Sequence, residues 1–177
     1  MKQIYILIGA ILLNGNVWAI DGVSAEIGQG NENTNMARIG AQWDWKKQWF
    51  TDGNWLVTGY WEASVGRWNG RNSAGNNHNI TDVGFTPVFR LQQKKFSGLA
   101  PYLEAGIGVH LISDTHINAN RRFSTAFQFG DHLGAGLRFG DRQQFDLGYR
   151  FQHLSNGSIK QPNPGINFSQ IRLAYHF

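Results

Sequence analysis

The chain has 177 residues, a formal net charge of +4 and no cysteine. This length suits one domain, and the absence of cysteine excludes both a disulfide framework and thiolate chemistry. Aromatic residues make up 14% of the chain and charged residues 16%, whereas an average soluble domain is about 25% charged. With 22 glycines and only 4 prolines, the composition is typical of an aromatic-rich β protein.

The first residues have the pattern of a secretory signal peptide. Lys2 provides a positive start, residues 4–13 are an apolar run, and residues 17–19 offer a cleavage site with a small alanine before the cut. The apolar run is too short for a spanning helix, which needs about 20 residues. We therefore expect a signal peptide at 1–19 and a mature domain at 20–177.

Apolar and polar residues alternate in eight segments of the mature domain. Because alternate side chains of a strand point to opposite faces, each segment has one apolar face and one face of polar or small residues. In the third segment, for example, Trp61 and Val65 alternate with Glu62 and Ser64. The segments are 22–28, 38–45, 55–65, 82–91, 102–111, 127–139, 145–155 and 167–177.

Polar connections separate these segments, and the longest is expected at 67–79. Apolar-out, polar-in strands with short turns at one end and longer loops at the other are typical of an outer-membrane barrel. The sequence therefore predicts an all-β fold, an eight-stranded antiparallel transmembrane β-barrel of the outer membrane, with side chains filling its lumen. A soluble barrel is disfavoured, because the small and polar inward residues would make a poor hydrophobic interior.

Aromatic residues near the strand ends agree with a membrane location, because interfacial girdles are built from such residues. The expected girdle residues are Trp43, Trp45, Trp49, Phe50, Trp55 and Trp68. The final Phe177, with Tyr175 and Leu173 on the same face, resembles the C-terminal signal of bacterial outer-membrane proteins.

Candidate catalytic residues lie at the end of segment 145–155. Its apolar face continues with His153 and Ser155 in the same alternation, and Asn167 is expected on that face of the next segment. A strand tilted by about 40° climbs about 2.5 Å per residue, which places these residues at the top of an apolar band about 25 Å tall. With both termini on the periplasmic side, this top is expected to be the lipid-facing outer-leaflet side. Serine needs a base, and the base needs an orienting group, so an esterase-type site is one interpretation. A His-x-Ser pair by itself can equally mark where an apolar face meets the headgroups.

Strand register predicts an acidic neighbour for this site. If Phe139 lies opposite Phe145, antiparallel pairing places Asp131 beside His153 on the lipid-facing side. A carboxylate there is costly without a function or an interfacial depth, so Asp131 is an alternative acid. Donors for an oxyanion are available in the following loop at Asn156, Gly157 and Asn163.

The mature chain resembles the lipid A 3-O-deacylases of the PagL type, which are eight-stranded outer-membrane esterases. The resemblance is carried by TGYWEASVGRW at 58–68, YLEAGIGV at 102–109, DHLGAGLRF at 131–139 and HLSNGSIKQPNPGIN at 153–167. The last of these motifs is the most specific. By this resemblance, Ser155 would be the nucleophile, His153 the general base and Asn156 a residue needed for activity.

One position departs from the family pattern, because Asn167 stands where the family has a glutamate. Asparagine can accept the imidazole N–H and hold the ring, but it cannot offset the imidazolium charge, so a slower reaction is expected. Outer-membrane phospholipase A is a family that uses asparagine in this role. Otherwise Asp131 would have to serve.

The resemblance implies an enzyme of the bacterial outer membrane that hydrolyses the 3-O-linked acyl chain of lipid A in lipopolysaccharide, without a metal or cofactor. The expected partners are lipopolysaccharide and the outer membrane, with a homodimer left open and no nucleic acid. The alternatives are an outer-membrane phospholipase or acyltransferase on the same barrel, and a catalytically impaired structural barrel. Candidate contacts for lipid A phosphates are Arg67, Arg71, Arg121 and Arg122.

Overall fold

The computed structural model describes residues 19–31, 33–71, 77–95, 98–118 and 121–177, so the predicted signal peptide falls almost entirely outside the described residues. Within these ranges, no helix is long and apolar enough to cross a membrane. The strands are β1 (Gly22–Gly30), β2 (Thr34–Asp44), β3 (Trp55–Arg71), β4 (Asn77–Gln93), β5 (Ala100–Ile112), β6 (His116–Asn118), β7 (Arg121–Arg122), β8 (Phe127–Phe139), β9 (Phe145–Ser155) and β10 (Ile166–His176).

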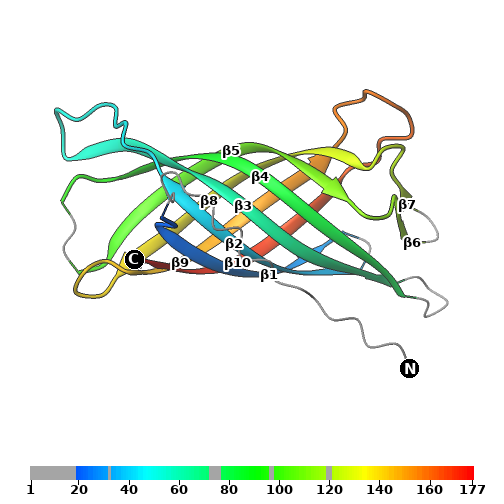
Figure 1. The fold of residues 1–177 in the computed structure, drawn as a ribbon, viewed down its shortest axis with the longest axis horizontal. Coiled ribbons are helices and arrows are strands. Elements are labelled where there is room, and N and C mark those ends of the chain that lie inside the picture. Colours follow the sequence, from blue (N-terminus) through cyan, green and yellow to red (C-terminus); the bar gives the residue numbers. More distant parts are fainter. Residues whose placement is uncertain (1–18, 32, 72–76, 96–97, 119–120) are drawn as a thin grey trace, which may run out of the picture.

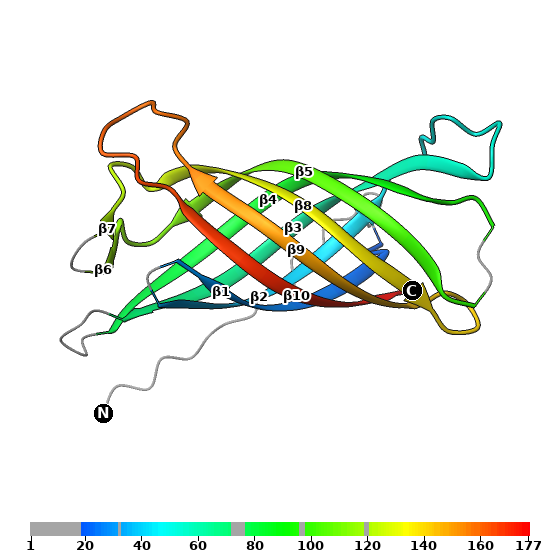
Figure 2. The ribbon, with the colours of Figure 1, turned by 180° about the vertical axis from the view of Figure 1, so that it is seen from behind.

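Eight strands form a closed antiparallel barrel in the order β1-β10-β9-β8-β5-β4-β3-β2 (Figures 1 and 2). The barrel sheet has no free edge, because β1 pairs with β10. The two remaining strands, β6 and β7, pair with each other in the connection between β5 and β8. The predicted eight-stranded antiparallel barrel is therefore confirmed.

The two ends of the barrel differ in their connections. Gly22 pairs with His176, so β1 starts and β10 finishes at the same end, here called the terminal end. The opposite end, here called the loop end, carries β6, β7 and the connection between β9 and β10 (Figure 1). The connections at the terminal end are 45–54, 94–99 and 140–144, and those at the loop end are 31–33, 72–76, 113–126 and 156–165.

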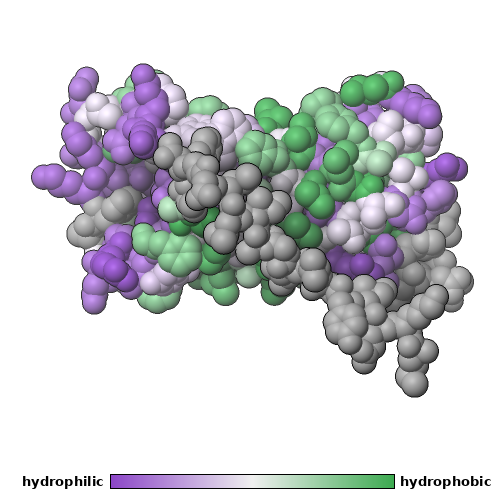
Figure 3. Space-filling model, viewed as in Figure 1, coloured by the Kyte–Doolittle hydropathy of each residue, from purple (hydrophilic) through white to green (hydrophobic). Residues whose placement is uncertain are grey.

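The outer wall of the barrel is apolar. Burial alternates along the strands with the predicted period, and in β5 every second residue is exposed over the whole strand. Large outward side chains such as Ile107 and Leu133 are 68% and 69% exposed. In Figure 3 hydrophobic side chains gather over the middle of the barrel and hydrophilic ones at its ends, as a membrane-spanning wall requires.

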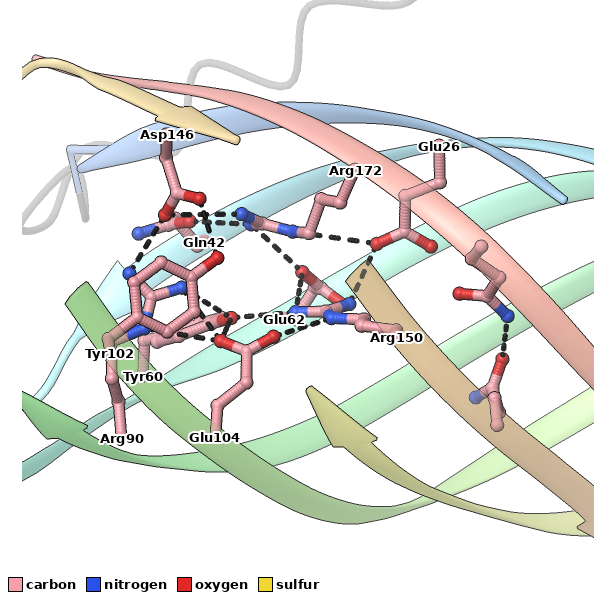
Figure 4. Close-up of polar contacts among 12 residues, drawn as sticks. Glu26, Gln42, Tyr60, Glu62, Arg90, Tyr102, Glu104, Asp146, Arg150 and Arg172 are labelled. Atoms are coloured by element: carbon pink, nitrogen blue, oxygen red, sulfur yellow. Dashed lines mark hydrogen bonds and ion pairs between the residues drawn. The ribbon is translucent and has the colours of Figure 1, made fainter. Parts of the chain in front are cut away.

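The lumen towards the terminal end is filled by paired charges (Figure 4). Arg150 donates hydrogen bonds to Glu104, Glu26 and Glu62 at 2.6, 2.7 and 2.8 Å. Arg90 binds Glu104 and Asp146 at 2.7 and 2.9 Å. Buried charges are tolerated only when they are paired in this way, and these side chains fill the lumen rather than leave a pore.

The lumen at the loop end is apolar, which the polar-in pattern did not predict. Ile117 of β6 and Phe123 are fully buried there, so the connection between β5 and β8 folds back over the barrel mouth. A Cβ at Gly70 would collide with the carbonyl of Ile117, so glycine allows this close approach. The apolar plug consists of Met36, Trp68, Ile80, Ile112, Ile117, Phe123, Leu154, Ile166 and Phe168.

The prediction that Trp68 belongs to the outer aromatic girdle was wrong. Trp68 is 0% exposed and packs against Phe168 with ring centroids 5.1 Å apart. The reason is strand parity, because Trp68 shares the inward face of β3 with Glu62 and Ser64, which are also buried.

The prediction of a long loop at 67–79 was also wrong. β3 continues to Arg71 and β4 begins at Asn77, and these two residues are paired. The ladder uses backbone groups, so polar residues can extend a hairpin beyond the apolar band. The polar connection expected between segments 102–111 and 127–139 likewise contains the short β6–β7 hairpin.

Candidate active site on the outer wall

The candidate site lies across β8, β9 and β10, which are neighbours in the barrel (Figure 2). The predicted register of the β8–β9 hairpin is confirmed, because Phe139 lies opposite Phe145 and Asp131 opposite His153. On the other side of β9, Asn167 lies opposite His153. His153 is therefore flanked by a carboxylate on one strand and an amide on the other.

His153 is oriented by Asn167. Both side chains are half-buried, and His153 Nδ1 lies 2.6 Å from Asn167 Oδ1. Because an amide oxygen only accepts hydrogen bonds, this contact places the ring proton on Nδ1. The other ring nitrogen, Nε2, keeps its lone pair and is available as a base.

Gly165 supports the same ring from the adjoining connection. A Cβ at position 165 would lie 2.6 Å from His153 Cε1 and 3.2 Å from Nε2, so a side chain there would displace the imidazole. The backbone φ of Gly165 is +61°, which also favours glycine. The carbonyl of Gly165 accepts a hydrogen bond of 2.7 Å from the Arg121 guanidinium. The connection between β5 and β8 thus helps to hold the residue that packs on His153.

Ser155 is the last residue of β9, and it shares the outward face of this strand with His153. It is half-buried and lies opposite Phe129 of β8. The two positions are separated by about 6.6 Å along the strand, which side-chain rotation can bridge. The structure therefore brings Ser155, His153 and Asn167 together on one patch of the outer wall.

Asn156 points the other way, into the protein, and is 0% exposed. Its side-chain amide donates to the carbonyl of Lys160 at 2.7 Å and to Ser124 Oγ at 2.8 Å. Its backbone N–H donates to Asn163 Oδ1 at 3.0 Å. Asn156 therefore joins the connections 113–126 and 156–165 behind the site, and its own donors are already used.

The other two oxyanion candidates differ from Asn156. Asn163 accepts through its oxygen, so its amide N–H groups are not used in that contact. Gly157 follows in a turn where Gly157 and Ser158 have φ values of +61° and +64°.

Asp131 is exposed on the lipid-facing side of β8. His153 Nδ1 is bonded to Asn167, so Asp131 does not orient the ring in this arrangement. Of the remaining histidines, His110 is bonded to Asp82 inside the lumen, and His132 and His176 are buried. In the part of the chain that the structure describes, no group of three or more His, Cys, Asp or Glu residues could hold a metal ion.

Sequence reasoning identified the outward residues and missed those that hold them. Gly165 lies within the motif at 153–167, and its glycine was a usable signal for a close approach. Arg121 was expected only as a contact for lipid A phosphates. Its bond to Gly165 and the role of Ser124 were not recognisable, because both residues reach the site from a connection more than thirty residues away in the chain.

A closed barrel with an apolar wall and a histidine–asparagine pair beside a serine on that wall defines an outer-membrane β-barrel with a hydrolase-type site. The family model described as Lipid A 3-O-deacylase (PagL) matches residues 35–176. The chain belongs to this family, which confirms the resemblance seen in its motifs.

Similar proteins agree with this assignment. Lipid A deacylase PagL of Pseudomonas aeruginosa is 36% identical over 146 residues, which cover 81% of this chain and 79% of that protein. Lipid A deacylase PagL of Bordetella bronchiseptica is 35% identical over 133 residues, with coverages of 71% and 66%. The crystal structure of the outer membrane enzyme PagL matches with a TM-score of 0.79 at 31% identity, covering 88% of this chain and 99% of that one.

Proposed function

We propose that this chain hydrolyses the ester that joins the 3-position acyl chain to lipid A, with Ser155 as nucleophile and His153 as general base. The observation that carries the proposal is the 2.6 Å contact between His153 Nδ1 and Asn167 Oδ1, on the same outward patch as Ser155. It leaves Nε2 free to take a proton. The substrate is suggested by the family and by the names of both relatives.

The reaction follows from these positions. His153 Nε2 takes the hydroxyl proton of Ser155 while Oγ bonds to the ester carbonyl carbon. When the tetrahedral intermediate collapses, the bond to the sugar oxygen breaks, and His153 gives the proton to that oxygen. A water molecule, deprotonated by the same nitrogen, then cleaves the acyl-serine and releases the fatty acid. Serine and histidine are restored.

Asn167 supports the base without adding charge. It fixes the ring tautomer through the Nδ1 contact, which is the orienting part of the role that a carboxylate plays in a triad. It cannot stabilise the imidazolium that forms during the attack by Coulomb attraction. The proposed enzyme therefore works more slowly than it would with a carboxylate at position 167.

The oxyanion is assigned to the Gly157 N–H and the amide of Asn163. Asn156 supports both indirectly, because its backbone N–H holds the Asn163 oxygen and its side chain ties the loop to Lys160. Loss of one oxyanion donor in a serine hydrolase costs about 100- to 1000-fold in kcat. A substitution of Asn156 would thus act through the loop, as a displacement of these donors.

The site is assigned to the outer leaflet. The apolar outward row of β9 reaches Phe151, and His153 and Ser155 follow where the strand ends at the loop end of the barrel. In outer-membrane barrels the longer loops are extracellular. A lipid-facing site at this height would receive lipid A by lateral diffusion.

The test is release of fatty acid by the folded barrel in detergent. Purified protein is incubated with lipopolysaccharide, and the masses of the lipid A and of the released fatty acid are measured by mass spectrometry. We expect loss of the 3-position hydroxyacyl chain, and no loss with Ser155→Ala or His153→Ala. Release from glycerophospholipids instead, or undiminished release by Ser155→Ala, would contradict the proposal.

A further inference from the structure

The ladder between β1 and β10 is completed by a side chain. β1 ends at Gly30, which pairs with Phe168. The next residue, Asn31, donates its backbone N–H to the carbonyl of Asn167 at 3.1 Å. In return, the backbone N–H of Asn167 donates to Asn31 Oδ1 at 2.9 Å. The side-chain oxygen of Asn31 thus occupies the place that a backbone carbonyl has in a regular antiparallel pair.

On the β1 side this pair is the last one that holds the start of β10, whereas on the β9 side Ile166 still pairs with Leu154. β10 begins at Ile166, directly after the connection 156–165, so Asn167 lies where a strand is prone to fray. Its backbone N–H and C=O face Asn31, while its side chain contacts His153 on β9. The position of Asn167 Oδ1 therefore depends on a residue from the connection between β1 and β2.

We propose that Asn31 is a positioning residue for the reaction, acting on His153 through the backbone of Asn167. This inference rests on the proposed function. It gains weight from the amide at position 167, because a neutral hydrogen bond weakens steeply when its distance or angle changes. A carboxylate would keep attracting an imidazolium over a larger displacement. A barrel with asparagine at this position depends more on a fixed backbone, and Asn31 fixes it on the β1 side while the ladder to β9 fixes it on the other.

The first experiment compares kcat and KM for lipid A deacylation in detergent. Asn31→Ala removes the acceptor, and we expect kcat to fall about tenfold with KM within about twofold, because misplacement of a catalytic group affects the chemical step. Asn31→Asp keeps an acceptor oxygen and should restore most of kcat. In Asn31→Ser the side-chain oxygen is too short to reach the backbone N–H of Asn167, so kcat should fall as in Asn31→Ala. This variant replaces Asn31→Ala in the comparison if the alanine variant does not fold.

Asn33→Gly is the matched control. Asn33 lies in the same turn, has a φ of +55° that glycine adopts readily, and takes part in neither bond to Asn167. We expect parental kinetics. A loss equal to that of Asn31→Ala would show that disturbance of the turn, rather than the missing oxygen, lowers the rate, and would overturn the assignment.

A double-mutant cycle then separates positioning from general destabilisation. Asn31→Ala should cause no further loss of kcat in an Asn167→Ala background, because the bond it acts through is already gone. In an Asn167→Glu background, the decrease in log kcat caused by Asn31→Ala should be less than half of the decrease that it causes in the parent protein. Full additivity in the Asn167→Ala background would overturn the positioning role. If Ser155→Ala remains active, the proposed function itself fails, and the two failures are thereby distinguished.

Discussion

Gly165 packs so closely against His153 that a Cβ at Gly165 would lie 2.6 Å from the Cε1 atom of the histidine ring. The imidazole is thus confined between a glycine backbone and the Asn167 amide. The site therefore requires glycine at position 165, because any side chain there would collide with the His153 ring. This contact also gives a direct way to move the ring without changing any group that takes part in the proposed chemistry.

Gly165→Ala is expected to lower kcat by about 100-fold, because the added Cβ displaces the His153 ring from the position in which it contacts Asn167. The matched control is Gly98→Ala, since Gly98 has nearly the same φ of +59° and no atom of the described residues lies within 4 Å of its Cβ position. Both variants carry a similar backbone strain at a positive φ, so a difference between their kcat values reports the contact with His153. Equal kcat values for the two variants would show that the contact with His153 is unimportant.

The identity of the orienting group is tested at positions 167 and 131. We expect Asn167→Glu to raise kcat about tenfold or more by stabilising the imidazolium, and Asn167→Ala to lower it by a similar factor. Asp131→Asn should change kcat less than about twofold, because His153 Nδ1 is bonded to Asn167. The measurement is the initial rate of hydroxyacyl release. A large loss in Asp131→Asn with none in Asn167→Ala would reverse the assignment.

The outward residues of the site were predictable because a membrane wall demands an apolar residue at every second position. His153 and Ser155 continue the alternation of Phe145 to Phe151, and a short turn set the register that brings Asp131 opposite His153. Asn167 followed from the same counting. These inferences need only strand geometry, which is nearly independent of the loops.

The supporting residues were not predictable, because loop conformation brings them to the site. Asn31 is separated from Asn167 by 136 positions, and no alternation links the two. Ile117 and Phe123 stand in a polar stretch, and their burial depends on the connection folding back over the mouth. Trp68 was misassigned because nearness to a strand end was weighed above parity, which placed it inside.

Arg121 provides a test of the contact between the two long connections. Arg121→Gln shortens the side chain and removes the charged donor to the Gly165 carbonyl, so we expect kcat to fall about threefold to tenfold as Gly165 loosens. Arg122→Gln is the control, because this neighbour is exposed. The comparison uses kcat with saturating lipid A. If Arg122→Gln is as slow as Arg121→Gln, the arginines act on the substrate charge and not through Gly165.

Arg150 tests whether the lumen network stabilises the barrel independently of catalysis. Its side chain is 2% exposed and contacts three carboxylates. Arg150→Met leaves them without this partner, and removal of one member of a buried ion network costs about 3–5 kcal/mol. The midpoint of urea unfolding in lipid vesicles should fall accordingly, whereas kcat per folded protein should stay within about twofold, since the network lies in the lumen and the site on the outer wall.

Arg67→Met is the control for this change, because Arg67 is an exposed arginine on the outer side of β3. Removal of an exposed charge should alter the unfolding free energy by no more than about 0.5 kcal/mol. If Arg150→Met is no less stable than Arg67→Met, the paired charges only fill space, and an apolar side chain fills it equally well. If Arg150→Met is as stable as the parent but loses activity, the lumen and the outer site are coupled through β9, and the two faces of that strand do not act independently.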